Sequence, residues 1–159
     1  MYAPITADHE FLDVRHAVIA AARELERRMP EQVTTAWWKE ERGQKIFVDF
    51  NQANRDRTIA GAYSPRALPH APVSTPLLWE ELADADPRNY TVLSIPDRLE
   101  TVGDPWADMG DKPGSIEVLL QWWQRDLDSG LGELPFPPDY PKMPGEPMRV
   151  QPSRARKSN

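Results

Sequence analysis

The 159-residue chain contains no cysteine, which excludes disulfide bonds, thiolate metal sites and a cysteine nucleophile. No apolar run approaches the roughly 20 residues that a membrane-spanning helix needs. The segment from Met1 to Phe11 also lacks the basic start and apolar stretch of a secretory signal peptide. We therefore expect a soluble, cytoplasmic protein that does not associate with membranes.

Several familiar catalytic patterns are missing as well. The sequence has no glycine-rich phosphate loop, no acid pair at the spacing of glycosidases and no recognisable Ser/His/Asp arrangement. Its three histidines lie on the polar side of a predicted helix (His9 and His16) or between prolines (His70), and we do not expect any of them to be catalytic. The pair Asp84 and Asp86 lies in a polar stretch before a proline, which predicts a solvated turn rather than a metal site.

Charge is unevenly distributed along the chain. Residues 80–133 carry thirteen acidic and four basic side chains, whereas residues 39–66 carry six basic and four acidic ones. The net charge of −6 argues against non-specific binding of nucleic acid by bulk charge. It leaves room for a local phosphate site within residues 39–66.

Apolar residues at spacings of three and four predict two long amphipathic helices. The first is expected from Asp8, as its cap, to Met29, where Pro30 ends it, and the second from Ser115 to Leu127. Shorter helical segments are predicted at 57–63, 77–82 and 96–102.

Segments rich in β-branched and aromatic residues predict strands. Residues 33–38 and 45–50 read as an antiparallel hairpin, 72–76 as a short edge strand and 90–95 as a further strand. We predict an α+β fold with a mixed, mostly antiparallel sheet and flanking helices over residues 1–134. Residues 135–159 are predicted to form a proline-rich and basic tail, either wrapped over the domain or acting as the ligand of a proline-recognising module.

Asp49 is the most informative candidate residue. Strand alternation places this acid on the inward side of the second predicted strand, where an unpaired carboxylate is costly to bury. It is therefore expected to be hydrogen-bonded, paired with arginine or bound to a divalent cation. Arg42, Gln52 and Arg66 lie before and after it, and such groups could hold a nucleoside triphosphate or simply neutralise the acid.

A series of ordered motifs carries a resemblance to a known family. The motifs are Trp37-Trp-Lys-Glu-Glu-Arg42, Ile46-Phe-Val-Asp-Phe-Asn-Gln52, Ala62-Tyr-Ser-Pro-Arg66, Val73-Ser-Thr-Pro76 and Gly103-Asp-Pro-Trp106. With their neighbours they resemble the polymerase domain of bacterial DNA ligase D, a branch of the archaeo-eukaryotic primase superfamily. The resemblance runs over roughly residues 10–155.

This resemblance implies a template-directed nucleotidyltransferase that extends DNA ends during double-strand break repair by non-homologous end joining, with Mn²⁺ or Mg²⁺ as cofactor. It implies that Asp49 is the third of three metal-binding catalytic aspartates and that Arg66 contacts the triphosphate. Arg42 and Gln52 match positions that line the same nucleotide pocket. The implied partners are a nucleoside triphosphate and DNA ends.

The family's Asp-x-Asp strand lies upstream of the part that this sequence matches. We therefore expect the C-terminal half of a primase-polymerase domain, inactive alone and completed by a polypeptide that carries the N-terminal half, or else self-associating. Two alternatives stay open: a catalytically dead module that binds nucleotides or DNA ends, and a truncated remnant.

Overall fold

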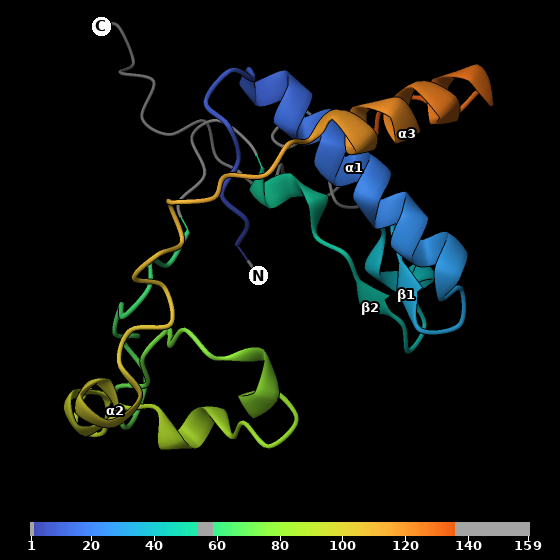
Figure 1. Cartoon of the computed structure of the whole chain (residues 1–159). Coiled ribbons are helices and arrows are strands. Elements are labelled where there is room, and N and C mark those ends of the chain that lie inside the picture. Colours follow the sequence, from blue (N-terminus) through green and yellow to red (C-terminus); the bar gives the residue numbers. More distant parts are fainter. Residues whose placement is uncertain (1, 54–58, 136–159) are drawn as a thin grey trace, which may run out of the picture. The chain divides into compact units, whose positions relative to one another are not determined.

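The computed structural model describes residues 2–53 and 59–135 (Figure 1). Within them lie three α-helices and one two-stranded sheet, which confirms the predicted α+β class. The chain divides into two compact units, one made of Met1–Thr6 and Thr58–Gly114 and the other of Ala7–Arg57 and Ser115–Asn159. Part of the helical segment predicted at 57–63 and nearly all of the predicted tail lie outside the described residues.

Helix α1 (Phe11–Arg28) is the central element of the second unit. It begins after Glu10, whose N–H donates to the Asp13 carboxylate at 3.0 Å, so the predicted cap at Asp8 is two residues too early. The apolar spacing predicted the helix but not its buried face, because Phe11 and Leu25 are 62% and 40% exposed whereas Arg15 and Arg23 are buried. The core that α1 forms consists of Ile19, Ala20, Ala22, Trp37, Phe50 and Trp123.

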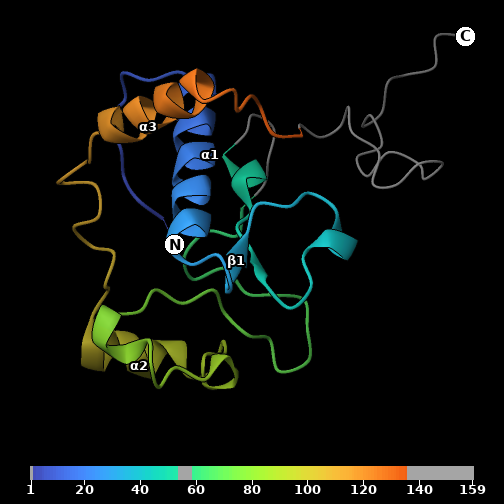
Figure 2. The same cartoon turned by 90° about the vertical axis from the view of Figure 1, so that its right-hand side faces the viewer.

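Helix α3 (Glu117–Asp128) packs across α1 (Figure 2). Its buried Asp126 faces Arg23 at 3.6 Å and Arg27 at 3.2 Å, and both arginines belong to α1. The ring of Trp123 stacks on His16 with centroids 4.2 Å apart. The two predicted amphipathic helices are thus confirmed, and their contact combines an apolar core with ion pairs.

The predicted antiparallel hairpin is wrong. Strands β1 (Val33–Thr34) and β2 (Ile46–Phe47) pair in parallel, with Val33 opposite Ile46. Because β1 ends at Thr34, the connection spans residues 35–45 and includes the 3-10 helix η1 (Lys39–Glu41). A connection of that length can cross over and return in the same direction, which the six-residue turn inferred from sequence could not do.

Glu24 of α1 lies within a group of arginines that joins α1 to α3. Hydrogen bonds from Arg27 and Arg28, with a further one from Arg125, lower the pKa of Glu24 from 4.5 to about 2. Since the folded-state pKa lies below the ordinary value, the carboxylate stabilises the fold fully above pH 4.5 and loses that effect as the pH falls toward 2.

We therefore expect Glu24→Gln to lower stability near neutral pH and to flatten the decline in stability between pH 4.5 and 2. Urea unfolding at a series of pH values measures both effects. Glu31→Gln, an exposed position just beyond α1, is the matched control and should leave the pH profile unchanged. A Glu24→Gln profile that runs parallel to that of the unsubstituted chain would contradict this expectation.

The first unit contains helix α2 (Ile95–Val102), which Gly103 ends with a positive φ of 76°. The strand predicted at 90–95 is wrong, because residues 91–94 form a turn in which the Ser94 hydroxyl accepts from Thr91 N–H at 2.9 Å. The helix predicted at 77–82 is confirmed only as the 3-10 helix η3 (Trp79–Glu81). Glu81 of η3 receives two hydrogen bonds from Arg98 of α2, at 2.6 and 2.7 Å.

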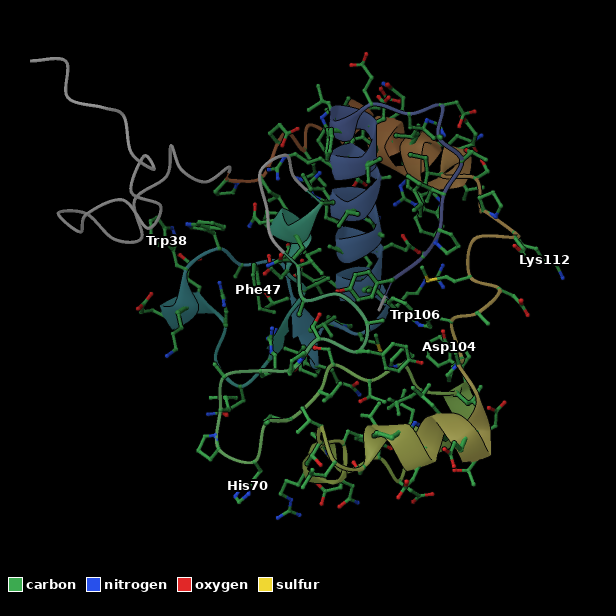
Figure 3. The ribbon with its side chains drawn as sticks, turned by 90° about the vertical axis from the view of Figure 1, so that its left-hand side faces the viewer. Trp38, Phe47, His70, Asp104, Trp106 and Lys112 are labelled. Atoms are coloured by element: carbon green, nitrogen blue, oxygen red, sulfur yellow. The ribbon has the colours of Figure 1, made fainter. Side chains whose placement is uncertain are left out.

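Residues 64–74 of the first unit form a short antiparallel hairpin. Arg66 N–H donates to Pro72 O at 2.8 Å, and Ser74 N–H donates to Ser64 O at 3.0 Å. Its tip carries two residues with positive φ, His70 and Ala71, and the exposed His70 points away from the ribbon (Figure 3). The edge strand predicted at 72–76 is represented by isolated bridges, Pro65 with Val73 and Pro72 with Thr91.

No helix among residues 2–53 and 59–135 has the length and apolar character required to cross a membrane.

Candidate functional site

Asp49 follows β2 and caps the 3-10 helix η2 (Phe50–Gln52). Its Oδ1 accepts a hydrogen bond from Asn51 N–H at 3.0 Å, and its Oδ2 accepts one from Gln52 Nε2 at 3.1 Å. The side chain is exposed. The two hydrogen bonds fix the carboxylate on the side that faces the turn. Each carboxylate oxygen can accept more than one hydrogen bond, so the side that faces solvent can still bind a ligand.

The turn that carries Asp49 is held in place from α1. Buried Arg15 donates from Nη1 to Asn51 Oδ1 at 3.3 Å and from Nη2 to Leu134 O at 2.9 Å. Phe50, between Asp49 and Asn51, is fully buried in the core against Trp37 and Phe47. A buried arginine and a buried ring thus determine where the exposed carboxylate lies.

The prediction that Asp49 is buried on the inward side of a strand is wrong. Strand β2 ends at Phe47, so the alternation that would turn Asp49 inward stops two residues earlier. The chain then enters η2, and Phe50 takes the buried position instead. Of the alternatives open at the sequence level, the structure contains the hydrogen-bonded carboxylate, with Asn51 and Gln52 as donors.

Arg42 is half-buried and contacts its own loop. It donates from Nε to Ala36 O at 3.0 Å and from Nη2 to Trp37 O at 2.7 Å, and its guanidinium lies over the Phe47 ring at 3.6 Å. These contacts close the connection between β1 and β2. Its assignment to a nucleotide pocket stays a prediction, as does that of Gln52, whose amide binds Asp49.

Arg66 lies in the first unit, on the hairpin 64–74, and its side chain is exposed. Among residues 2–53 and 59–135, no carboxylate or carbonyl oxygen accepts a hydrogen bond from its guanidinium. The backbone of Arg66 is fixed by Pro72 O, whereas the charged end of the side chain faces solvent. Such a group is available for an anionic ligand.

The donor set around Asp49 suits a hard cation only in part. Carboxylate oxygen is the ligand type that Mg²⁺ and Mn²⁺ prefer, and Asp49 presents it on an exposed turn. In the part of the chain that the structure describes, no group of three or more His, Cys, Asp or Glu residues could hold a metal ion. Asp49 therefore fits one corner of a metal site and needs further ligands.

Asp84 is exposed within a turn at residues 82–84, as predicted, whereas Asp86 is half-buried just after that turn. The Asp86 side chain caps the 3-10 helix η4 (Pro87–Asn89) and pairs with Arg88, which lowers the pKa of Asp86 to about 2. His16, on α1, approaches Glu133 with Nε2 at 2.6 Å from Oε1 and has a structural place against Trp123.

Two hydrogen bonds near the candidate residues could not be predicted from the sequence, because each joins residues that are far apart along the chain. Arg15 and Asn51 are 36 residues apart, and Tyr63, whose hydroxyl donates to Asp104, lies 41 residues from its acceptor. Arg15 stands among the apolar positions of α1, and a charged residue at such a position is a weak hint of a buried partner. Nothing local in the sequence identifies which partner that is.

The chain matches the family model described as LigD, primase-polymerase domain, over residues 1–106. It therefore belongs to the LigD primase-polymerase domain family, as the motifs indicated. The matched region contains Asp49, Arg66, Arg42 and Gln52.

The relatives agree with this family. The chain is 32% identical over 145 residues to the multifunctional non-homologous end joining protein LigD of Mycolicibacterium smegmatis, and 34% identical over 130 residues to that of Pseudomonas aeruginosa. These matches cover 89% and 80% of the chain but only 18% and 15% of the relatives.

Its structure is similar to the polymerase domain of Mycobacterium tuberculosis ligase D in complex with DNA, with a TM-score of 0.53 and 30% identity. The similarity covers 64% of this chain and 36% of that one. The chain thus spans less than a fifth of the two full-length relatives and about a third of the solved domain.

Proposed function

We propose that this chain supplies part of a template-directed nucleotidyltransferase that extends DNA ends during non-homologous end joining. In this proposal Asp49 contributes a carboxylate to a divalent cation, Mn²⁺ or Mg²⁺, and Arg66 contacts the triphosphate of the incoming nucleotide. The observation that carries the proposal is the family match over residues 1–106, because it includes both residues. The complex of the solved relative with DNA supports DNA as the second substrate.

The geometry supports the role proposed for Asp49. Its two oxygens are oriented by Asn51 N–H and Gln52 Nε2, and the turn is fixed by buried Arg15, so the carboxylate is preorganised. A preorganised ligand loses little conformational entropy when a cation binds. When bound, a divalent cation would neutralise charge that develops on the phosphate oxygens during transfer.

The geometry of Arg66 supports a complementary role. A planar guanidinium can donate two parallel hydrogen bonds to a phosphate, and the exposed guanidinium of Arg66 is not occupied by any described acceptor. Its backbone is held by the hairpin 64–74, so the side chain projects from a fixed point. Arg66 would therefore position the triphosphate rather than take part in proton transfer.

We further propose that the 159-residue polypeptide alone does not extend primers. Transfer by two metal ions needs both ions fixed about 3.5–4 Å apart by several carboxylates, and Asp49 supplies one. A single carboxylate holds Mg²⁺ weakly, because this ion gives up its water ligands reluctantly. The remaining carboxylates would come from a segment with the family's Asp-x-Asp strand, supplied in the same polypeptide or by a partner.

The sheet offers a place where such a segment could pair. Strand β2 is bonded to β1 on one side, and its Ile46 is 68% exposed. The other edge of β2 presents the N–H and C=O groups of Phe47, which follows from the parallel pattern in which Ile46 and Val48 donate toward β1. No further strand among residues 2–53 and 59–135 pairs with this edge, and such an edge favours addition of a strand, with a second copy of this chain as the alternative occupant.

A measurement of nucleotide binding distinguishes two hypotheses, a chain that retains a nucleotide site and a truncated remnant without function. With Mn²⁺ present, the chain should bind a nucleoside triphosphate saturably, and Arg66→Ala should weaken binding on the order of tenfold to a hundredfold through loss of a charge-assisted hydrogen bond. Isothermal titration calorimetry measures this change. Arg88→Ala is the matched control, because Arg88 is also exposed but is paired with Asp86.

Absence of saturable binding by the unsubstituted chain would contradict the retained site and favour a remnant. Binding that persists while a complemented complex stays inactive would favour the catalytically dead module. Complementation means adding the Asp-x-Asp segment of a relative, either fused in frame or supplied as a second polypeptide.

A further inference from the structure

Tyr63 adopts a backbone conformation that an aromatic residue rarely takes. Its φ is 59°, in the left-handed region where a side chain with a Cβ crowds the following carbonyl. Its N–H donates to Ser74 O at 2.8 Å, across the base of the hairpin 64–74. Residues held in this region persist where the surrounding structure fixes them, and such residues concentrate at functional sites.

The side chain of Tyr63 provides the fixing contact. Its hydroxyl donates to Asp104 Oδ1, which also accepts Trp106 N–H at 2.9 Å. Asp104 follows directly on the end of α2 at Gly103, with Trp106 beside it (Figure 3). The Tyr63–Asp104 hydrogen bond therefore ties the base of the hairpin to the end of a helix in the same unit.

The ionisation of the pair favours this bond at neutral pH. Burial and the hydrogen bond to Asp104 raise the pKa of Tyr63 to about 12, against a smaller opposing effect of Arg98. The same bond and the one from Trp106 N–H lower the pKa of Asp104. The phenol thus remains a donor and the carboxylate remains an acceptor.

The Tyr63–Asp104 hydrogen bond constrains the segment that carries Arg66. Beyond Tyr63, the backbone of Ser64 and Arg66 is bonded across the hairpin to Ser74 and Pro72. Pro65, with its fixed φ, lies between them and leaves little freedom for adjustment within the segment. The conformation at Tyr63 therefore sets the direction in which the segment leaves the base of the hairpin.

We propose that Tyr63 and Asp104 are positioning residues for nucleotide binding, which hold Ser64–Pro65–Arg66 in the conformation that presents the Arg66 guanidinium to a triphosphate. This inference rests on the proposed function of Arg66. Neither Tyr63 nor Asp104 need touch the nucleotide, because both act through the backbone that carries Arg66.

The test is a double-substitution cycle on the full chain, with Mn²⁺ and a nucleoside triphosphate as the probe. Tyr63→Phe removes only the hydroxyl, and we expect it to weaken binding about tenfold, because the competent conformation becomes a minor one. In the Arg66→Ala background, Tyr63→Phe should have no further effect. A general loss of structure would instead weaken binding in both backgrounds.

Three further variants separate positioning from loss of folding. Tyr2→Phe removes the other described tyrosine hydroxyl bonded within this unit, to Ala60 O at 2.6 Å, and should leave affinity unchanged. Asp104→Ala should match Tyr63→Phe, whereas Asp104→Asn keeps an oxygen acceptor and should restore most of the affinity. Hydrogen exchange at the Arg66 amide should become faster in Tyr63→Phe and not in Tyr2→Phe.

Each outcome decides the proposal. Loss of affinity that depends on Arg66 and is restored by Asp104→Asn supports it. Unchanged affinity in Tyr63→Phe, or a loss that simply adds to that of Arg66→Ala, overturns the positioning role and leaves the proposed function intact. Absence of binding by the unsubstituted chain overturns both.

Discussion

Asp49→Asn should abolish primer extension by a complex in which this chain is completed with the Asp-x-Asp segment of a relative. The substitution preserves the shape of the side chain and an oxygen that can accept from Asn51 N–H, but it removes the negative charge that a divalent cation requires. We expect a loss on the order of a thousandfold or more, because transfer depends mainly on positioning and charge stabilisation. Gel-based primer extension with Mn²⁺ measures the loss.

The matched control is Asp84→Asn, which neutralises an exposed acid in the polar stretch before Pro87. This variant should extend primers at the rate of the unsubstituted complex. If Asp49→Asn retained that rate as well, the carboxylate would be a structural cap of η2 and not a metal ligand.

Asp126→Ala should destabilise the second unit more than the substitution of any of its exposed charged residues. Asp126 is 2% exposed and pairs with Arg23 at 3.6 Å and Arg27 at 3.2 Å. Removing it leaves the buried guanidinium of Arg23 without its counter-charge, and breaking a buried pair in this way costs about 3–5 kcal/mol. Chemical denaturation followed by tryptophan fluorescence measures the change in the free energy of unfolding.

Asp128→Ala is the matched control, since Asp128 is exposed on the same helix and, within the part of the chain that the structure describes, accepts a side-chain hydrogen bond only from Gln124 Nε2. Its effect should stay below about 0.5 kcal/mol, as for most exposed positions. Equal effects of the two substitutions would show that α3 is not held to α1 by the ion pairs of Asp126.

The helices could be predicted from sequence because their signals are local. The apolar spacing of α1 and α3, the proline in the first turn of α2 and the closing Gly103 all act within a few residues of where they stand. The predicted cap at Asp8 is two residues too early, because the helix begins after Glu10, whose free N–H is bonded by the Asp13 carboxylate within the first turn.

Strand predictions failed where side chains compete with the ladder for backbone groups. At 90–95, β-branched residues favoured a strand, but hydrogen bonds of Thr91 and Ser94 to the nearby backbone stabilise a turn instead. The direction of β2 relative to β1 depends on where β1 ends, and propensity placed that end four residues late. Pairing direction is a tertiary property that strand propensity does not contain.

The candidate site shows the same difference between local signals, which the sequence contains, and long-range contacts, which it does not. Asp49 and Arg66 were identified from the sequence. The carboxylate of Asp49 is oriented locally by Asn51 N–H and Gln52 Nε2, whereas the contacts that hold the turn of Asp49 and the base of the hairpin of Arg66 come from distant parts of the chain. Arg15 reaches Asn51 from α1, and the Tyr63 hydroxyl reaches Asp104 beyond α2. Such pairs leave no periodic trace in a single sequence, so only coordinates reveal them.

Primer extension by the purified 159-residue chain, with and without the Asp-x-Asp segment of a relative, tests the central claim most directly. With Mn²⁺, a primed template and nucleoside triphosphates, we predict no template-dependent addition by the chain alone and measurable addition once the segment is present. Addition by the chain alone would contradict the claim that Asp49 is one ligand of a metal site completed by carboxylates from outside these 159 residues.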